Sequence, residues 1–106
     1  MNSIFEMLVK RSRQAPVITW AGQTMSFTKG VAEVKTMDIT PEGCETDYGI
    51  DIDPDYTGLP RGIFVEGYTV TYDGSVSSTS EDETVLIEAS KPGYQSVRAG
   101  LRIIIA

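Results

Sequence analysis

Residues 84–105, TVLIEASKPGYQSVRAGLRIII, contain two apolar segments separated by a proline- and glycine-containing turn. In each segment apolar side chains recur at every second position, which places them on one face of an extended strand. The stretch therefore predicts two β-strands joined at Lys91-Pro92-Gly93, each with one face in a core. The residues that share these inner faces are Val85, Ile87, Ala89, Leu101, Ile103 and Ile105.

Arg102 alone interrupts the apolar run at residues 101–105. A two-residue period leaves one face for the core, and burying an arginine is costly. We therefore expect Arg102 to face outward and the odd-numbered residues to face inward. Ile104 makes the outer face more apolar than a half-solvated strand requires, so we expect that face to be covered, with the N-terminal segment as the candidate cover.

Similar short segments occur upstream, separated by turns such as Pro41-Glu42-Gly43 and Asp73-Gly74. About seven short strands with no helical pattern between them predict an all-β fold, a β-sandwich within residues 16–106. The upstream candidates are residues 17–20, 23–27, 31–40, 48–52 and 68–72.

Two of these segments carry specific expectations about burial. In residues 31–40 we expect Val34 to face inward, together with Met37 or Ile39. In residues 48–52, the period of two predicts a strand with Tyr48, Ile50 and Ile52 on one face. Residues 53–62, DPDYTGLPRG, are expected to form a loop because they contain two prolines and two glycines.

The chain has 106 residues, one cysteine and no histidine. This length favours a single domain, which must be stabilised by packing because one cysteine cannot form a disulfide framework. The lack of histidine excludes Ser-His-Asp and Cys-His catalysis and most zinc sites.

Residues 1–14, MNSIFEMLVKRSRQ, differ from the rest in composition. Apolar residues at helical spacing precede three bases, and Ser3 with Glu6 matches a capping box. A helix this short is ordered only by packing against something else. We interpret 1–14 as a leader or linker, with a short docking helix as the alternative, and 15–106 as the domain.

Charge is distributed unevenly: residues 38–88 contain thirteen acids and one base, Arg61. This acidic middle repels phosphate backbones and anionic lipid, so we expect no nucleic-acid partner and no membrane insertion. We find neither an apolar run long enough to span a membrane nor a secretory signal in the sequence. The single cysteine is compatible with either the cytosol or a cell surface.

Several short sequence motifs also follow one another along the chain. They are Pro16-Val17-Ile18, Gly30-Val31-Ala32, Tyr48-Gly49-Ile50, Leu59-Pro60-Arg61-Gly62-Ile63, Tyr72-Asp73-Gly74, and the segments at residues 85–90 and 101–105. In this order, residues 16–105 resemble the immunoglobulin-like, cadherin-like modules of bacterial surface proteins, which are related to the cadherin-like domain of dystroglycans. The chain departs from that pattern at Gly74-Ser75-Val76, where the family usually has Gly-Thr-Pro, and residues 1–14 have no counterpart.

The resemblance implies an immunoglobulin-like β-sandwich that acts as a spacer or adhesion module, without catalysis, in a larger protein at the cell surface. Its partners would be neighbouring repeat domains or other proteins. Because a fold this widely reused does not determine function, two alternatives stay open. One is a module that binds a glycan or protein through its loops, and the other is a structural protein of a phage virion.

Asp51, Asp53 and Asp55 are the candidate metal ligands. Alternate aspartates can direct carboxylates to one side of an extended segment, and Ca²⁺ prefers such oxygen ligands. The segment does not match an EF-hand, because Tyr56 stands where the loop needs glycine and Gly62 where it needs glutamate. Some cadherin-like modules bind Ca²⁺ between repeats, so we expect an isolated copy to lack a complete site and to need no cofactor.

Other candidate groups favour structural roles. The carboxylates of these loops lack the apolar surroundings that a general acid needs, so we expect no enzymatic activity. Cys44 has acidic neighbours that disfavour its thiolate, which predicts an unreactive thiol. Among the aromatic residues, Tyr56 and Tyr94 fall in turns and are the expected exposed pair for glycan or protein binding.

Overall fold

The computed structural model describes residues 16–76 and 78–106, so the leader or helix expected at 1–14 lies outside the described residues. The described part is all-β and contains no helix, which confirms the predicted fold class and strand number. Accordingly, it offers no helix that could span a membrane. The strands are β1 (Gln23–Phe27), β2 (Glu33–Thr36), β3 (Glu45–Asp47), β4 (Ile63–Glu66), β5 (Thr69–Tyr72), β6 (Glu81–Ser90) and β7 (Val97–Ile105).

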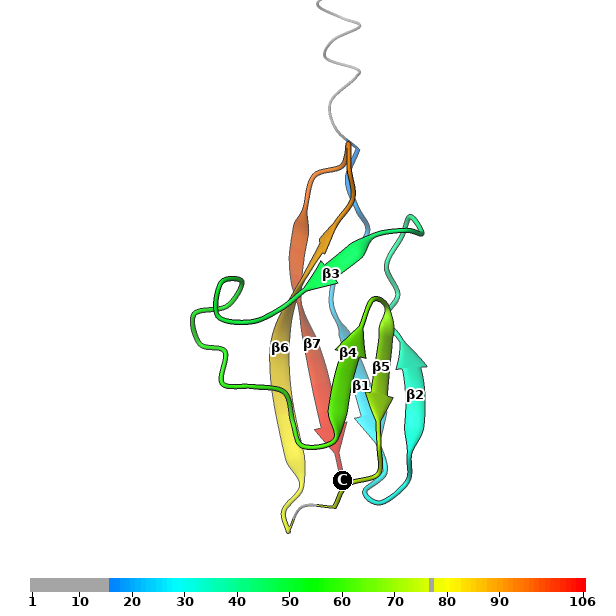
Figure 1. The fold of residues 1–106 in the computed structure, drawn as a ribbon, viewed down its shortest axis with the longest axis vertical. Helices are drawn as coiled ribbons and strands as arrows, with labels where there is room; N and C mark the ends of the chain where they lie inside the picture. Colours follow the sequence, from blue (N-terminus) through cyan, green and yellow to red (C-terminus); the bar gives the residue numbers. More distant parts are fainter. Residues whose placement is uncertain (1–15, 77) are drawn as a thin grey trace, which may run out of the picture.

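The strands form two sheets (Figure 1), one of four strands in the order β1-β7-β6-β3 and one of three in the order β2-β5-β4. The pairs β3–β6 and β2–β5 join strands that are not consecutive in the chain, so each sheet contains a crossover connection. All pairs are antiparallel except β1 and β7, which run parallel. The result is a β-sandwich with the apolar faces of both sheets turned toward each other.

The inner face of β7 matches the sequence prediction. Leu101 and Ile103 are fully buried and Ile105 is 4% exposed, whereas Arg102 faces solvent. Strand β7 lies between β1 and β6, so it is a central strand of its sheet, and this position accounts for its continuous apolar run. Ile104 is half-buried on the outer face; the expected N-terminal cover falls outside the described residues.

The prediction for residues 31–40 is partly wrong. Strand β2 covers only Glu33–Thr36, and Val34 is 62% exposed. The opposite face points inward: Met37 and Ile39 are buried, and the Nζ of Lys35 lies 5.6 Å from the centre of the Phe27 ring. A lysine can occupy an inward position at a sheet edge because its long stem lets the ammonium group reach water.

Residues 48–52 form a turn instead of the predicted strand. The backbone N–H groups of Ile52 and Asp53 both donate to the carbonyl of Gly49, at 3.1 and 2.8 Å. Gly49 has a φ of 127°, a conformation that favours glycine. Ile50 is consequently 68% exposed, and Ile52 is buried.

The strand predicted at residues 68–72 is confirmed as β5, and it forms a hairpin with β4, a strand that the alternation does not predict. Glu66 pairs with Thr69, so Gly67 and Tyr68 make a two-residue turn. Gly67 has a φ of 57°, as the first central residue of a type II′ turn requires. The Asp73-Gly74 segment, by contrast, leads the chain from β5 in one sheet toward β6 in the other.

Candidate functional site

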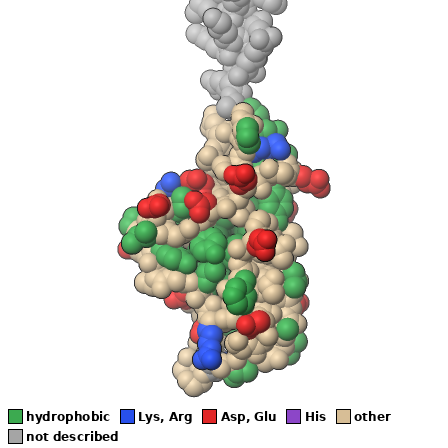
Figure 2. Space-filling view, in the orientation of Figure 1, with side chains coloured by type: hydrophobic (Ala, Val, Ile, Leu, Met, Phe, Trp, Pro, Cys, Tyr) green, Lys and Arg blue, Asp and Glu red, His purple; other side chains and the backbone are tan. Residues whose placement is uncertain are grey.

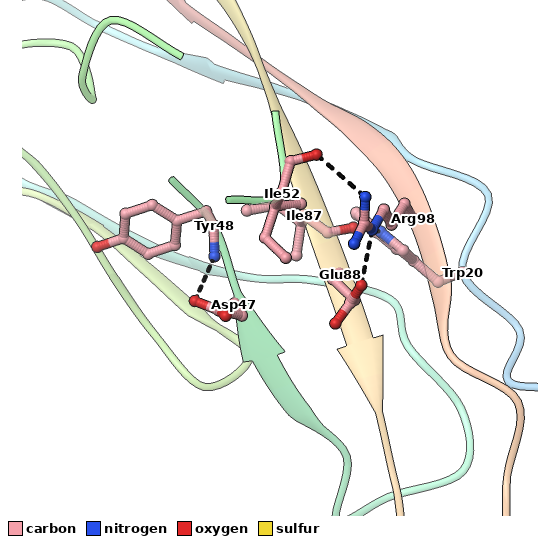
Figure 3. A network of polar contacts seen from close by, with 7 residues as sticks. All are labelled: Trp20, Asp47, Tyr48, Ile52, Ile87, Glu88 and Arg98. Carbon is pink, nitrogen blue, oxygen red and sulfur yellow. Dashed lines mark hydrogen bonds and ion pairs between the residues drawn. The ribbon is translucent and has the colours of Figure 1, made fainter. Parts of the chain in front are cut away.

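A long loop spans residues 48–61 and projects beside β6 (Figure 1). Its first turn is stabilised by Asp47, whose Oδ1 accepts the N–H of Tyr48 at 2.9 Å (Figure 3). Its second turn is closed by the N–H of Tyr56 donating to the Asp53 carbonyl, also at 2.9 Å. The rings of Tyr48 and Tyr56 then meet with their centres 6.0 Å apart. The loop is therefore an ordered, aromatic-containing part of the surface.

Arg98 on β7 attaches this loop to the four-stranded sheet. Its Nη1 donates to the carbonyl of Ile52 at 3.3 Å, and its Nε forms an ion pair with Glu88 at 2.7 Å (Figure 3). Glu88 is the direct cross-strand neighbour of Arg98 in the β6–β7 register. Oppositely charged neighbours of this kind stabilise a strand pair. Arg98 lies before the strand predicted at residues 101–105, because β7 begins four residues earlier, at Val97, so its pairing with Glu88 was not predicted.

Trp20 packs in the core and is hydrogen-bonded to the backbone of β6. Its side chain is 4% exposed, and its Nε1 donates to the carbonyl of Ile87 at 3.1 Å (Figure 3). A buried indole N–H needs such a partner, because leaving it unpaired would cost free energy. Trp20 is therefore a core residue with a specific backbone contact.

Two adjoining hollows lie between this loop and the beginning of β6. One, of about 380 Å³, is lined by residues 57–61 and 81–83, and the other, of about 230 Å³, by residues 53, 55–58 and 82–85. Both are partly open to solvent. Figure 2 shows acidic and apolar side chains gathered on the projecting loop at the left of the view. Such a surface can attract cations or basic groups.

The carboxylate of Asp82 in these hollows already has a partner. Its two oxygens accept from the Nε and Nη2 of Arg102 at 2.9 and 2.6 Å. This hydrogen bonding lowers the pKa of Asp82 and raises the pKa of Arg102. Asp82 therefore stays ionised near neutral pH, whereas a carboxyl that serves as a general acid needs a raised pKa.

The three candidate metal ligands occupy the turn between Tyr48 and Tyr56. Asp51 and Asp55 are exposed, Asp53 is half-buried, and the Oδ1 of Asp53 accepts the N–H of Asp55 at 2.9 Å. Within residues 16–76 and 78–106, no three acidic or cysteine side chains come close enough to hold a metal ion. The Ca²⁺ proposal for a pair of neighbouring modules remains a prediction.

Cys44 and two tyrosines have well-defined surroundings. Cys44 is 7% exposed, and its Sγ lies 3.2 Å from the Pro41 carbonyl. Its N–H donates to the hydroxyl of Tyr68, whose pKa is raised mainly by burial. Tyr56 and Tyr94, expected to be exposed, are half-buried and pack against the core, because the turns that carry them fold back over the sheets.

A comparison of the chain with protein-family models finds no match, and a search of curated proteins also finds none. The two-sheet β-sandwich is thus established by the structure, and the more specific resemblance rests on the motifs.

Proposed function

We propose that the chain is an immunoglobulin-like structural module, a non-catalytic spacer or adhesion unit within a larger bacterial surface protein. The observation that carries this proposal is where the described domain begins, at Pro16, and where it ends, at Ala106. The Pro16 carbonyl accepts the N–H of Gln95 at 3.0 Å, next to the turn at residues 91–93. Ala106 donates to the Phe27 carbonyl and accepts from the N–H of Lys29, both at 3.1 Å.

These two places are opposite ends of the sandwich (Figure 1). A chain that passes from one end of a module to the other is suited to an in-line series of domains, because each copy adds its length to the next. The aromatic residues support the same role. Trp20, Phe27 and Tyr72 all lie in the core, where they stabilise the sandwich.

Small-angle X-ray scattering of two full-length copies fused in tandem tests the spacer role. An in-line pair has a maximum dimension close to the sum of two modules, whereas a side-by-side pair is much more compact. A compact pair would contradict the proposal.

Antibody labelling of intact cells that carry the native gene tests the location. Labelling on the outer surface supports the proposal, and labelling confined to phage particles would instead favour a virion structural protein. Specific retention of a sugar on a glycan array, lost when Tyr48 and Tyr56 are replaced by alanine, would favour a binding module.

A further inference from the structure

The first and last strands of the described chain are direct neighbours. Strand β1 pairs with β7 in parallel over five residues, from Gln23 opposite Leu101 to Phe27 opposite Ile105. The two hydrogen bonds of Ala106 to Phe27 and Lys29 extend the pairing by one more residue. The segments nearest the two ends of the domain are thus joined by one continuous ladder.

The direction of this pairing determines how it responds to tension. Both strands run toward the end of the sandwich that carries Ala106 (Figure 1). Tension between the two ends of the domain reaches β1 at its beginning, Gln23, through residues 16–22, and reaches β7 at its final residue, Ile105. The strands are then drawn past each other lengthwise, and the hydrogen bonds, which lie across the strands, share the load. An antiparallel pair would have both loaded ends together and would open one bond at a time.

Side-chain packing reinforces the same pair. Met25 faces Ile103 and Phe27 faces Ile105 in the register, and all four side chains are at most 4% exposed. Sliding β1 along β7 would therefore disrupt core packing together with the backbone bonds.

The chain just before β1 approaches β7 unusually closely. A Cβ atom at Gly22 would lie 2.6 Å from the carbonyl oxygen of Gly100. Further toward the end, Thr19 and Thr40 exchange two backbone hydrogen bonds, at 2.8 and 3.1 Å. These contacts hold residues 16–22 against the body of the domain, in line with the ladder.

From this geometry we infer that the β1–β7 pair is a mechanical clamp that lets the domain bear tension applied through its two ends. The inference rests on the proposed spacer role, since only a module within a longer chain is loaded in this way. It adds resistance to force, which a spacer does not by itself require.

Force spectroscopy in two pulling directions tests the clamp. All chains carry Cys44→Ala and an added cysteine after Ala106. One chain has its second attachment before Met1, which shears the β1–β7 pair. The other has Thr28→Cys, at an exposed position just after β1, which peels the same pair open from one end. At one pulling speed we expect a severalfold higher unfolding force in the shearing direction.

A matched pair of variants separates the clamp from general stability. Ile103 on β7 and Ile87 on β6 are both fully buried, but only Ile103 faces β1 in the register. Ile103→Ala and Ile87→Ala should lower the melting temperature to a similar extent, and Ile103→Ala should cause the larger loss of force in the shearing direction. If either alanine variant fails to fold, Ile103→Val and Ile87→Val provide the same comparison.

Equal forces in the two pulling directions would overturn the clamp, as would equal losses of force in the two isoleucine variants. Either result would leave the spacer proposal intact, because that proposal is decided by the scattering of the tandem chain.

Discussion

Neighbouring residues near the end of β7 have opposite environments. Ile103 is fully buried, whereas the side chain of Arg102 is 52% exposed and pairs with Asp82 on β6. The difference follows from the pleat of the strand, which turns successive side chains to opposite faces of the sheet. Stability at this position should therefore depend on the inward residue far more than on its neighbour.

Ile103→Ala should lower the free energy of unfolding by about 2–5 kcal/mol, because it leaves a cavity in a tightly packed core. Arg102→Ala should have a much smaller effect, because it removes an exposed ion pair. Urea denaturation followed by fluorescence measures both. Similar losses for the two variants would show that the register of β7 is wrong.

The Asp82–Arg102 pair should also give a small pH dependence. Because the folded pKa of Asp82 is lowered, its contribution is present above the unfolded pKa and is lost as the pH falls through the folded pKa. The stability difference between the native chain and Arg102→Ala should therefore shrink in acid. A difference that stays constant down to strongly acidic pH would contradict the pairing.

At the scale of elements, one arginine of β7 donates a hydrogen bond to the loop at residues 48–61, in addition to the packing of the loop's side chains on the core. Arg98 connects the Ile52 carbonyl to Glu88, and the loop has no strand of its own to pair with the sheet. Loops with few such attachments open more readily than the strands that carry them.

Arg98→Ala should speed backbone hydrogen exchange in residues 49–56 and leave the exchange of β6 and β7 nearly unchanged. Arg102→Ala is the matched control, since it removes an arginine–carboxylate pair on the same strands, and the hydrogen bonds of this arginine go to Asp82 instead of to a loop carbonyl. Hydrogen exchange followed by mass spectrometry measures both. Unchanged loop exchange in Arg98→Ala would mean that the turns alone hold the loop.

The same loop carries the candidate Ca²⁺ ligands. We expect no Ca²⁺-specific stabilisation of a single copy, because a site between modules needs ligands from a neighbour. Thermal unfolding in EDTA, millimolar Ca²⁺ and millimolar Mg²⁺ tests this, since a ligand bound only by the folded state raises the melting temperature. A rise specific to Ca²⁺ and abolished by Asp51→Asn with Asp53→Asn would establish a site within one module.

For the whole molecule, the described core is assembled from residues 18–105. Its members come from both sheets and from the segment before β1, in which Ile18 and Trp20 are buried. The domain should therefore be complete once this segment is present.

Deleting residues 1–14 should leave a cooperatively folded domain with a melting temperature within a few degrees of the full chain. Circular dichroism during heating measures this, and light scattering reports any loss of solubility. An unfolded truncation would show that residues 1–14 complete the core. Lower solubility with an unchanged fold would mean that they cover an apolar surface.

The sequence by itself determined the all-β class, the positions of β1, β5, β6 and β7 to within a few residues, and the inward face of β7. Each of these depends on local side-chain alternation. A period of two places the apolar side chains on one face of a strand, and that face is buried. For the candidate site, the sequence predicted the loop at residues 53–62 and its acidic character. It could not identify Arg98, because the role of this residue depends on a carbonyl 46 positions away in the chain.

Only the tertiary structure decided which strands are neighbours and which face of the weaker segments is buried. An apolar inner face fits many partners, so alternation could not predict that β1 lies parallel to β7. Val34 is exposed because the edge strand β2 turns Lys35 toward Phe27. Residues 48–52 form a turn because the N–H groups of Ile52 and Asp53 both donate to the Gly49 carbonyl. These local hydrogen bonds satisfy backbone groups that a strand would instead pair with a neighbouring strand. Long-range pairing and competition between local and distant hydrogen bonds are properties of the assembled chain, and no short stretch of sequence contains them.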